Sequence, residues 1–318
     1  MATVAVLEGG RSLERQVSLK SGARVEDALQ RLGHTAVAID VGSDLVARLT
    51  ELRPDAAFVA LHGRDGEDGT IQELLEVLAL PYTGSGVAAC IRCWDKVLTK
   101  HLLRDAGIPT PDFHAFSEMA FRELGAAQAL PAIEQQLDFP LVVKPAAQGS
   151  ALGIKFARTA ADVPAAIVSA FSYDRKVLLE RYVPGRDLAV SVVEDGGGEP
   201  QALPVVEAVP EGRDFYDFEA RYEIGRTRFV CPAELPDGVA ARTQELAVEA
   251  YRALGCAGFA RVDLMLREDG ELFVLEANSV PGLTETSLLP QAADAAGIDF
   301  DRLVERILSI ALARGAAV

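Results

Sequence analysis

Apolar residues follow two different spacings in the first third of the chain. Continuous apolar runs are typical of strands buried on both faces, and they fall at residues 3–7, 35–39 and 56–61. Apolar positions that recur every three to four residues predict helices, and they fall at residues 14–32 and 70–78. Strands that alternate with helices form a parallel sheet with helices on its faces. We therefore expect a Rossmann-like N-terminal domain over residues 1–95.

The pattern changes after residue 95. A predicted helix at 96–106 ends at Gly107, and the prolines that follow prevent its continuation. Further strands are predicted at residues 141–144, 154–157 and 177–182, and a helix is predicted from about residue 161. A second unit is therefore expected over residues 96–185.

The last part of the chain, residues 186–318, has the signals of an antiparallel sheet. Two runs that flank three consecutive glycines, residues 188–194 and 201–208, predict a hairpin. A long polar loop is expected at 210–223. The remaining predicted elements are a helix at 242–254, a hairpin of residues 259–266 and 272–277, and a helix at 301–311.

The second of these hairpins carries candidate metal ligands. Asp269 and Gly270 favour a two-residue turn, which places Asp263 opposite Glu276 and Arg261 opposite Asn278. Alternation assigns Glu276 and Asn278 to one face and Phe273, Leu275 and Ala277 to the other. Two carboxylates on neighbouring strands repel each other unless a cation lies between them. Oxygen ligands select a hard cation such as Mg²⁺, although an ordinary solvated hairpin face remains an alternative.

A weaker signal for phosphate binding lies in the second unit. A strand that ends at Lys144 leads into a loop of small residues at 149–153, where backbone amides can approach phosphate. The loop lacks the Gly-Lys-Ser/Thr of a Walker A motif, and no Gly-x-Gly-x-x-Gly fingerprint follows Gly9. Backbone groups near Glu180 and the carboxylate of Asp187 could contact adenine and ribose.

The net charge of −16 argues against a nucleic-acid-binding surface. An acidic enzyme can still bind ATP if local lysines, arginines and a divalent cation hold the triphosphate. Four cysteines favour a reducing compartment, and Cys90 and Cys93 are expected to be buried packing residues. The N-terminus lacks the basic segment of a signal peptide, and there is no run of 18 apolar residues. We expect a cytoplasmic protein without a membrane span.

Taken together, these motifs resemble the D-alanine–D-alanine ligases of the ATP-grasp superfamily over nearly the whole chain. The matching segments are residues 9–18 (Gly-Gly-Arg-Ser-Leu-Glu-Arg-Gln-Val-Ser), 61–69 (Leu-His-Gly-Arg-Asp-Gly-Glu-Asp-Gly), 81–86 (Pro-Tyr-Thr-Gly-Ser-Gly), 95–96 (Asp-Lys), 215–222 (Phe-Tyr-Asp-Phe-Glu-Ala-Arg-Tyr) and 276–288 (Glu-Ala-Asn-Ser-Val-Pro-Gly-Leu-Thr-Glu-Thr-Ser-Leu). The resemblance implies an ATP-grasp fold of mixed α/β and α+β class after the N-terminal domain. It also implies peptidoglycan synthesis through an acylphosphate of D-alanine, two Mg²⁺ or Mn²⁺ ions, and a homodimer.

The resemblance also implies a role for individual residues. The expected catalytic residues are Glu14, Ser150, Tyr222, Arg261, Gly282 and Ser287. Arg261 and the Gly282 amide would form the oxyanion hole, and Ser150 and Tyr222 would bridge to Glu14. The expected ATP contacts are Lys96, Lys144, Gly149, Glu180, Arg181, Val183, Asp187, Arg221 and Phe273. The expected substrate contacts are Glu14, His62, Arg261, Gly282, Ser287 and Leu288, and the metal ligands are Asp263, Glu276 and Asn278.

Several positions depart from the family pattern. The nucleotide loop carries Ala146, Ala147 and Ala151 where relatives have more polar residues. Arg221 stands in place of a lysine and Asp187 in place of a glutamate, and the role of Glu8 is unexplained. Two alternatives therefore stay open: an ATP-grasp ligase of other amino-acid or hydroxy-acid substrates, and a nucleotide-binding protein without turnover.

Overall fold

The computed structural model describes residues 1–210 and 227–315. Its N-terminal sheet is parallel, in the order β2-β1-β3, as the alternating pattern predicts. The strands are β1 (Thr3–Glu8), β2 (Thr35–Asp40) and β3 (Ala56–Val59), and the helices are α1 (Arg15–Arg31), α2 (Leu45–Leu52) and α3 (Thr70–Val77). The centre of β1 is fully buried, because helices cover both faces of this sheet.

Two consecutive helices, α4 (Val87–Trp94) and α5 (Lys96–Asp105), lead into a four-stranded antiparallel sheet. Asp95 begins α5 by accepting hydrogen bonds from the Val97 and Leu98 amides. The sheet has the order β4-β7-β5-β6, with β4 (Phe113–Ser117), β5 (Leu141–Pro145), β6 (Lys155–Ala157) and β7 (Lys176–Arg181). The helices of this unit are α6 (Glu118–Arg122), α7 (Leu130–Leu137) and α8 (Val163–Phe171).

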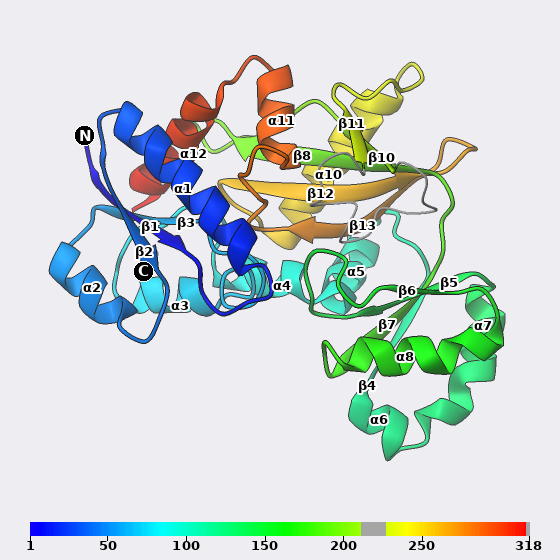
Figure 1. The fold of residues 1–318 in the computed structure, drawn as a ribbon. Coiled ribbons are helices and arrows are strands. Elements are labelled where there is room, and N and C mark those ends of the chain that lie inside the picture. The colour runs from blue at the N-terminus through cyan, green and yellow to red at the C-terminus, as the bar shows by residue number, and fades with distance from the viewer. Residues whose placement is uncertain (211–226, 316–318) are drawn as a thin grey trace.

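The largest sheet lies near the middle of the molecule (Figure 1). Its antiparallel strands run β11-β10-β8-β12-β13, and β9 also pairs with β8. The strands are β8 (Arg186–Glu194), β9 (Pro200–Ala202), β10 (Val206–Pro210), β11 (Thr227–Val230), β12 (Phe259–Leu266) and β13 (Leu272–Asn278). Helix α10 (Val239–Leu254) packs its buried residues against β8, β12 and β13.

The last two helices belong to the hydrophobic core of the N-terminal sheet. These helices, α11 (Leu288–Ala295) and α12 (Phe300–Arg314), contribute Leu289, Leu303 and Ile307 to one core with Val6 and Phe58. The two ends of the chain therefore pack together (Figure 1).

The strand predicted at residues 201–208 is divided into β9 and β10. Both segments pair with β8, but they are separated at Pro204. Proline has no backbone N–H and cannot donate to the ladder, so the pairing is interrupted there. The amide of the preceding residue, Leu203, still reaches the Ser191 carbonyl at 2.8 Å.

Candidate active site

The hairpin of β12 and β13 has the predicted register where the acidic residues lie. Asp263 pairs with Glu276 and Arg261 pairs with Asn278. The turn, however, has three residues and not two, because the Arg267 amide donates to the Glu271 carbonyl at 2.9 Å. Gly270 has a φ of 90°, the conformation that ends such a turn. A bulge between Asp263 and Leu264 then adds the residue that restores the predicted pairing.

The bulge also corrects the predicted faces of β13. Leu272, Val274 and Ala277 belong to the hydrophobic core against α10. Leu275 and Glu276, which are consecutive, both line the same cavity on the other side of the sheet. The expectation that Leu275 and Ala277 share a face was therefore wrong, because simple alternation does not continue through a bulge.

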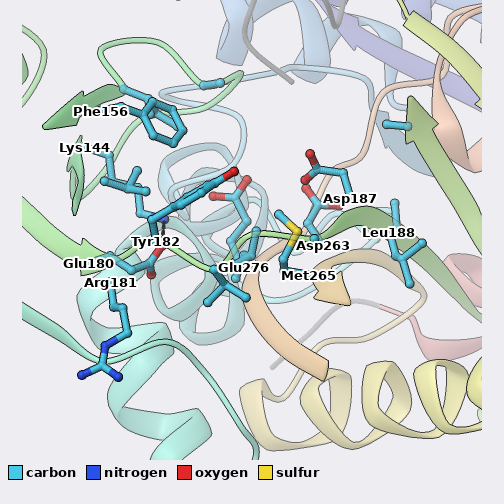
Figure 2. Close-up of a pocket in the computed structure, with 18 of the residues that line it drawn as sticks. Lys144, Phe156, Glu180, Arg181, Tyr182, Asp187, Leu188, Asp263, Met265 and Glu276 are labelled. Carbon is cyan, nitrogen blue, oxygen red and sulfur yellow. Dashed lines mark hydrogen bonds and ion pairs between the residues drawn. The ribbon is translucent and has the colours of Figure 1, made fainter. Parts of the chain in front are cut away.

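The larger cavity lies between the four-stranded β4-β7-β5-β6 sheet and the sheet that contains β8, β12 and β13 (Figure 2). Its empty space is about 1040 Å³ when the open solvent at its mouth is included. The predicted nucleotide residues among its lining are Lys144, Glu180, Arg181, Val183 and Asp187. Two of the predicted metal ligands, Asp263 and Glu276, also line it, as does the predicted substrate residue Leu288.

A buried ion-pair cluster lies at one end of this cavity. Lys144 Nζ is 2.8 Å from Glu180 Oε1, and Lys100, which the sequence analysis did not single out, forms an ion pair with Glu180 Oε2. Burial by itself raises the pKa of the Glu180 carboxyl, but Lys100 and Lys144 outweigh burial and keep that pKa below its ordinary value. Burial lowers the pKa of Lys100 to about 8. Near pH 7 the cluster therefore holds an ionised Glu180 carboxylate between Lys100 and Lys144.

Apolar side chains form the walls of the larger cavity, and sequence reasoning missed them. They are Val142, Ile154, Phe156, Tyr182, Met265 and Leu275. The rings of Phe156 and Tyr182 meet edge to face, 5.4 Å apart. Apolar residues on strands are also what a hydrophobic core requires, so the pattern alone gives no reason to assign them to a ligand. The Arg181 side chain points away from this cavity (Figure 2) and donates to the Leu137 carbonyl, so only its backbone faces inward.

A second, smaller cavity brings together residues from all three parts of the chain. The predicted residues among its lining are Glu14, His62, Lys96, Gly149, Ser150, Arg261, Glu276, Asn278 and Gly282. Glu276 lines both cavities, so they meet at this carboxylate. Ser150 Oγ donates a hydrogen bond to Glu14 Oε1, which is the predicted bridge. At Gly149 a Cβ atom would lie 2.6 Å from Glu14 Oε2, so the loop can approach this closely only with glycine there.

Two buried titratable groups line the smaller cavity beside these residues. Burial lowers the pKa of His62 to about 4, so its imidazole is neutral near pH 7. Burial and the nearby Glu14 raise the pKa of Glu67 to about 8, and Glu67 accepts a hydrogen bond from the Gly63 amide. The sequence analysis did not single out Glu67, although it lies in the His-Gly-x-x-Gly-Glu-Asp-Gly segment. The site therefore has less negative charge than its composition suggests.

The predicted metal ligands already have protein partners. Arg261 forms two hydrogen bonds with Asp263, at 2.6 and 2.7 Å, and Lys96 Nζ lies 3.1 Å from Glu276. Asn278 Oδ1 accepts from the Val280 amide. Within residues 1–210 and 227–315, no group of three His, Cys, Asp or Glu residues could hold a metal ion by itself. Two carboxylates and an amide fit a hard cation only when substrate phosphates complete its coordination.

The remaining predicted residues have different placements. Ser287 and Phe273 line neither cavity; Ser287 Oγ accepts from the Thr284 amide, and the Phe273 ring lies 5.4 Å from Arg267. Arg221 and Tyr222 lie outside the described residues. Cys90 and Cys93 are buried, as expected. Glu8 packs against Gly22 of α1, where burial raises the pKa of its carboxyl.

The structure has a cavity between two antiparallel sheets, with two lysines at one end and acidic residues of the β12–β13 hairpin in its lining. This arrangement is that of the ATP-grasp ligases. Solved structures agree with this class. The D-alanine–D-alanine ligase from Bacillus anthracis complexed with ATP matches with a TM-score of 0.83 and 33% identity, covering 99% of this chain and 98% of that one. The ligase from Coxiella burnetii matches with a TM-score of 0.80 and 25% identity, covering 99% of this chain and 96% of that one.

The sequence comparisons are more specific. The family described as D-ala D-ala ligase C-terminus matches residues 102–309, and the family described as D-ala D-ala ligase N-terminus matches residues 44–85. The D-alanine–D-alanine ligase of Moorella thermoacetica is 45% identical over 309 residues, which cover 97% of this chain and 99% of the relative. That of Alcanivorax borkumensis is 46% identical over 312 residues, which cover 98% and 94%. The chain belongs to the D-alanine–D-alanine ligase family, which confirms the resemblance and the fold class. None of the helices in the described part of the chain is long and apolar enough to cross a membrane.

Proposed function

We propose that this protein joins two D-alanines with the consumption of ATP and supplies D-alanyl-D-alanine for peptidoglycan synthesis. One observation carries the proposal: the larger cavity, which the predicted nucleotide residues line, and the smaller polar cavity meet at Glu276. A ligase needs adjoining cavities for ATP and the amino acid, because the γ-phosphate must pass directly from the bound nucleotide to the bound amino acid. The B. anthracis relative, described as complexed with ATP, supports the nucleotide assignment.

The chemistry follows from the charges around that junction. The carboxylate of the first D-alanine attacks the γ-phosphorus, the bond to ADP breaks, and an acylphosphate forms. Two anions must approach each other, and Lys96 and Lys144 supply positive charge at the two cavities. Mg²⁺ or Mn²⁺ held by Asp263, Glu276 and Asn278, as one or two ions, would neutralise further phosphate charge.

The second step joins the two amino acids. The amine of the second D-alanine attacks the acyl carbon and a tetrahedral oxyanion forms. The nitrogen then releases a proton, and phosphate leaves with the C–O bonding electrons. Arg261 and the Gly282 amide stabilise that oxyanion, and Glu14, held by Ser150, binds the first ammonium group. A cytoplasmic homodimer is part of the same proposal, by analogy with the family.

The test is ATP-dependent phosphate release with a panel of D- and L-amino acids and hydroxy acids. D-alanine is expected to give the highest kcat/KM. If only another amino acid or a hydroxy acid supports release, the substrate assignment is wrong. If no substrate supports release although ATP binds, the protein is a nucleotide-binding protein without turnover.

Two substitutions test the metal-binding hairpin. Asp263→Ala and Glu276→Ala are each expected to lower Mg²⁺-supported kcat by at least about 100-fold, because each removes charge at the phosphates. Glu271→Ala is the matched control, since Glu271 is an acidic residue of the same hairpin that pairs with Arg267 at the exposed turn. Circular dichroism establishes that all three variants fold. Near-normal turnover of either cavity variant contradicts the metal assignment.

A further inference from the structure

The turn between β13 and α11, residues 280–283, is fixed by hydrogen bonds from the N-terminal part of the chain. The Leu283 amide donates to Ser21 Oγ at 3.2 Å, and Arg24 Nη1 donates to the Leu283 carbonyl at 2.7 Å. On the other side of Gly282, the Val280 carbonyl lies 3.1 Å from His62 Nδ1. The Val280–Pro281 and Gly282–Leu283 peptide groups, one on each side of the Pro281–Gly282 peptide that carries the Gly282 N–H, are therefore fixed by residues more than 200 positions earlier in the sequence.

Ser21 and His62 also contact each other, so these bonds form one chain. Ser21 Oγ lies 2.9 Å from His62 Nε2, Ser21 is fully buried, and the exposed fraction of His62 is 3%. Buried polar groups that all have partners hold a single geometry, because leaving any one of them unpaired is costly.

The positions of the protons in this chain can be assigned. A carbonyl oxygen can only accept, so His62 Nδ1 carries the proton that is donated to Val280. Since burial keeps the pKa of His62 near 4, its Nε2 is unprotonated and accepts from the Ser21 hydroxyl. The Ser21 oxygen is then the acceptor for the Leu283 N–H. Each donor has one acceptor, and both ring nitrogens of His62 are occupied by the protein.

We infer that Ser21 is a positioning residue, which acts with His62 to aim the Gly282 N–H at the reacting carbonyl. This inference rests on the proposed function, in which Gly282 stabilises the tetrahedral oxyanion. It also changes the expected role of His62, which acts through the turn and not by a hydrogen bond to the substrate. A donor displaced by a fraction of an ångström stabilises a transition state poorly, so the relay affects kcat more than ATP binding.

The chain offers a matched control for Ser21. Ser18 lies one turn earlier on α1, is equally buried, and also makes two hydrogen bonds, from the Gly9 amide and to the Ala60 carbonyl, each 2.8 Å long. Its partners lie outside residues 280–283. Ser18→Ala and Ser21→Ala each remove one buried hydroxyl from the same helix, so they are expected to lower Tm by similar amounts.

The experiment measures kcat, KM for ATP and Tm of the full-length enzyme and its variants. Ser21→Ala is expected to lower kcat by about 10- to 100-fold with KM for ATP unchanged. Ser18→Ala is expected to lower Tm but to keep kcat within about twofold of the wild type, because Ser18 does not contact the turn that carries Gly282. Equal kcat in the two variants would overturn the inference.

A double variant separates the two roles of His62. If His62 acts through the relay, adding His62→Gln to Ser21→Ala lowers kcat by no more than about threefold further. If His62 contacts the substrate independently, the double variant loses the product of the two single effects, and the inference is wrong.

If Ser21→Ala cannot be purified, Arg24→Met replaces it, because Arg24 fixes the same turn from a partly buried position. Arg24→Met should lower kcat at unchanged KM for ATP. Arg31→Met should not lower kcat, because Arg31 lies on the same helix as Arg24 but pairs with Asp301 of α12. Full kcat in Arg24→Met refutes the relay.

These outcomes are distinct from a failure of the proposed function. If the wild-type enzyme releases no phosphate with D-alanine, the ligase assignment fails before any variant is compared. If the wild type turns over and Ser21→Ala behaves like Ser18→Ala, only the positioning role fails.

Discussion

Lys100 provides the sharpest test of how burial determines the strength of an ion pair in this protein. The exposed fractions of the Lys100 and Glu180 side chains are 0% and 3%, and Lys100 Nζ also donates to Thr110 Oγ1 at 2.6 Å. Lys100→Met keeps the length of the side chain but removes its charge. Glu180 then remains buried with Lys144 as its ionic partner.

The expected cost follows from this geometry. Removing one partner of a buried ion pair typically costs 3–5 kcal/mol, because a charge is left in a medium that solvates it poorly. Since Lys144 still neutralises Glu180, we expect a loss near the low end, about 3 kcal/mol in the free energy of unfolding. The pKa of Glu180 is expected to rise, because one of the two charges that lower it is gone. KM for ATP should increase by about tenfold, because the Glu180 carboxylate that lines the larger cavity is then held by one lysine and no longer by two.

The matched control is Lys176→Met. Lys176 Nζ lies 2.6 Å from Asp95, but the exposed fractions of these side chains are 43% and 26%. Exposed pairs contribute at most about 1 kcal/mol, so this variant should change stability little. Urea unfolding at pH 7 and ATP-dependent phosphate release measure both variants. If the two substitutions cost the same, burial does not determine the effect, and the reasoning is refuted.

A third variant identifies the origin of the cost. Lys100→Met, Lys144→Met and Glu180→Gln together remove all three charges of the cluster, so the triple variant should be more stable than the sum of the three single effects predicts. A triple variant that is less stable by the full sum of the three single effects would show that packing of the lysine stems, and not the charge, is what matters.

Two further substitutions test the smaller cavity. Gly149→Ala places a Cβ atom 2.6 Å from Glu14 Oε2, so KM for D-alanine should rise by about tenfold. Gly196→Ala is the control, because the added atom meets open space there. Equal KM values in the two variants would contradict the close approach. Glu67 has a raised pKa of about 8, so between pH 4.5 and 8 the folded state keeps a proton that the unfolded state has lost, and stability falls as pH rises through this window. Glu67→Gln should remove up to about 4 kcal/mol of that decline, measured as the difference in unfolding free energy between pH 5 and pH 8; an unchanged slope would assign the decline to other groups.

Strong periodicity made most of the fold predictable, and the missed elements have local reasons. Helix α11 contains Pro290, which argues against a helix interior, but the proline lies in the first turn, where its missing N–H has no intrahelical partner. Strand β4 has only five residues, and its conformation depends on pairing with β7, which follows about 60 residues later. Such pairing cannot be read from a short segment, because strand propensity depends on its neighbours.

Charged residues of the site were easier to predict than its apolar walls. Lys144, Glu276 and Arg261 stand out because charge is rare on buried strands and needs a reason. Phe156 and Met265 do not stand out, since apolar residues there are also what packing requires. Lys100 was missed for a different reason: a lysine in a predicted helix is normally exposed, and only the tertiary structure buries it against Glu180.

The metal hairpin shows how a correct register can follow from an incorrect turn. A two-residue turn at Asp269 and Gly270 would align Asp263 with Glu276 without interruption, whereas the three-residue turn shifts the pairing by one position. The bulge at Leu275 removes that shift before the acidic pair is reached, and it directs Leu275 into the nucleotide cavity beside Glu276. An uninterrupted hairpin would give the same carboxylate pair but would place Leu275 on the opposite face. The two departures from ideal geometry therefore place an apolar side chain in the larger cavity, next to the carboxylate at which the two cavities meet.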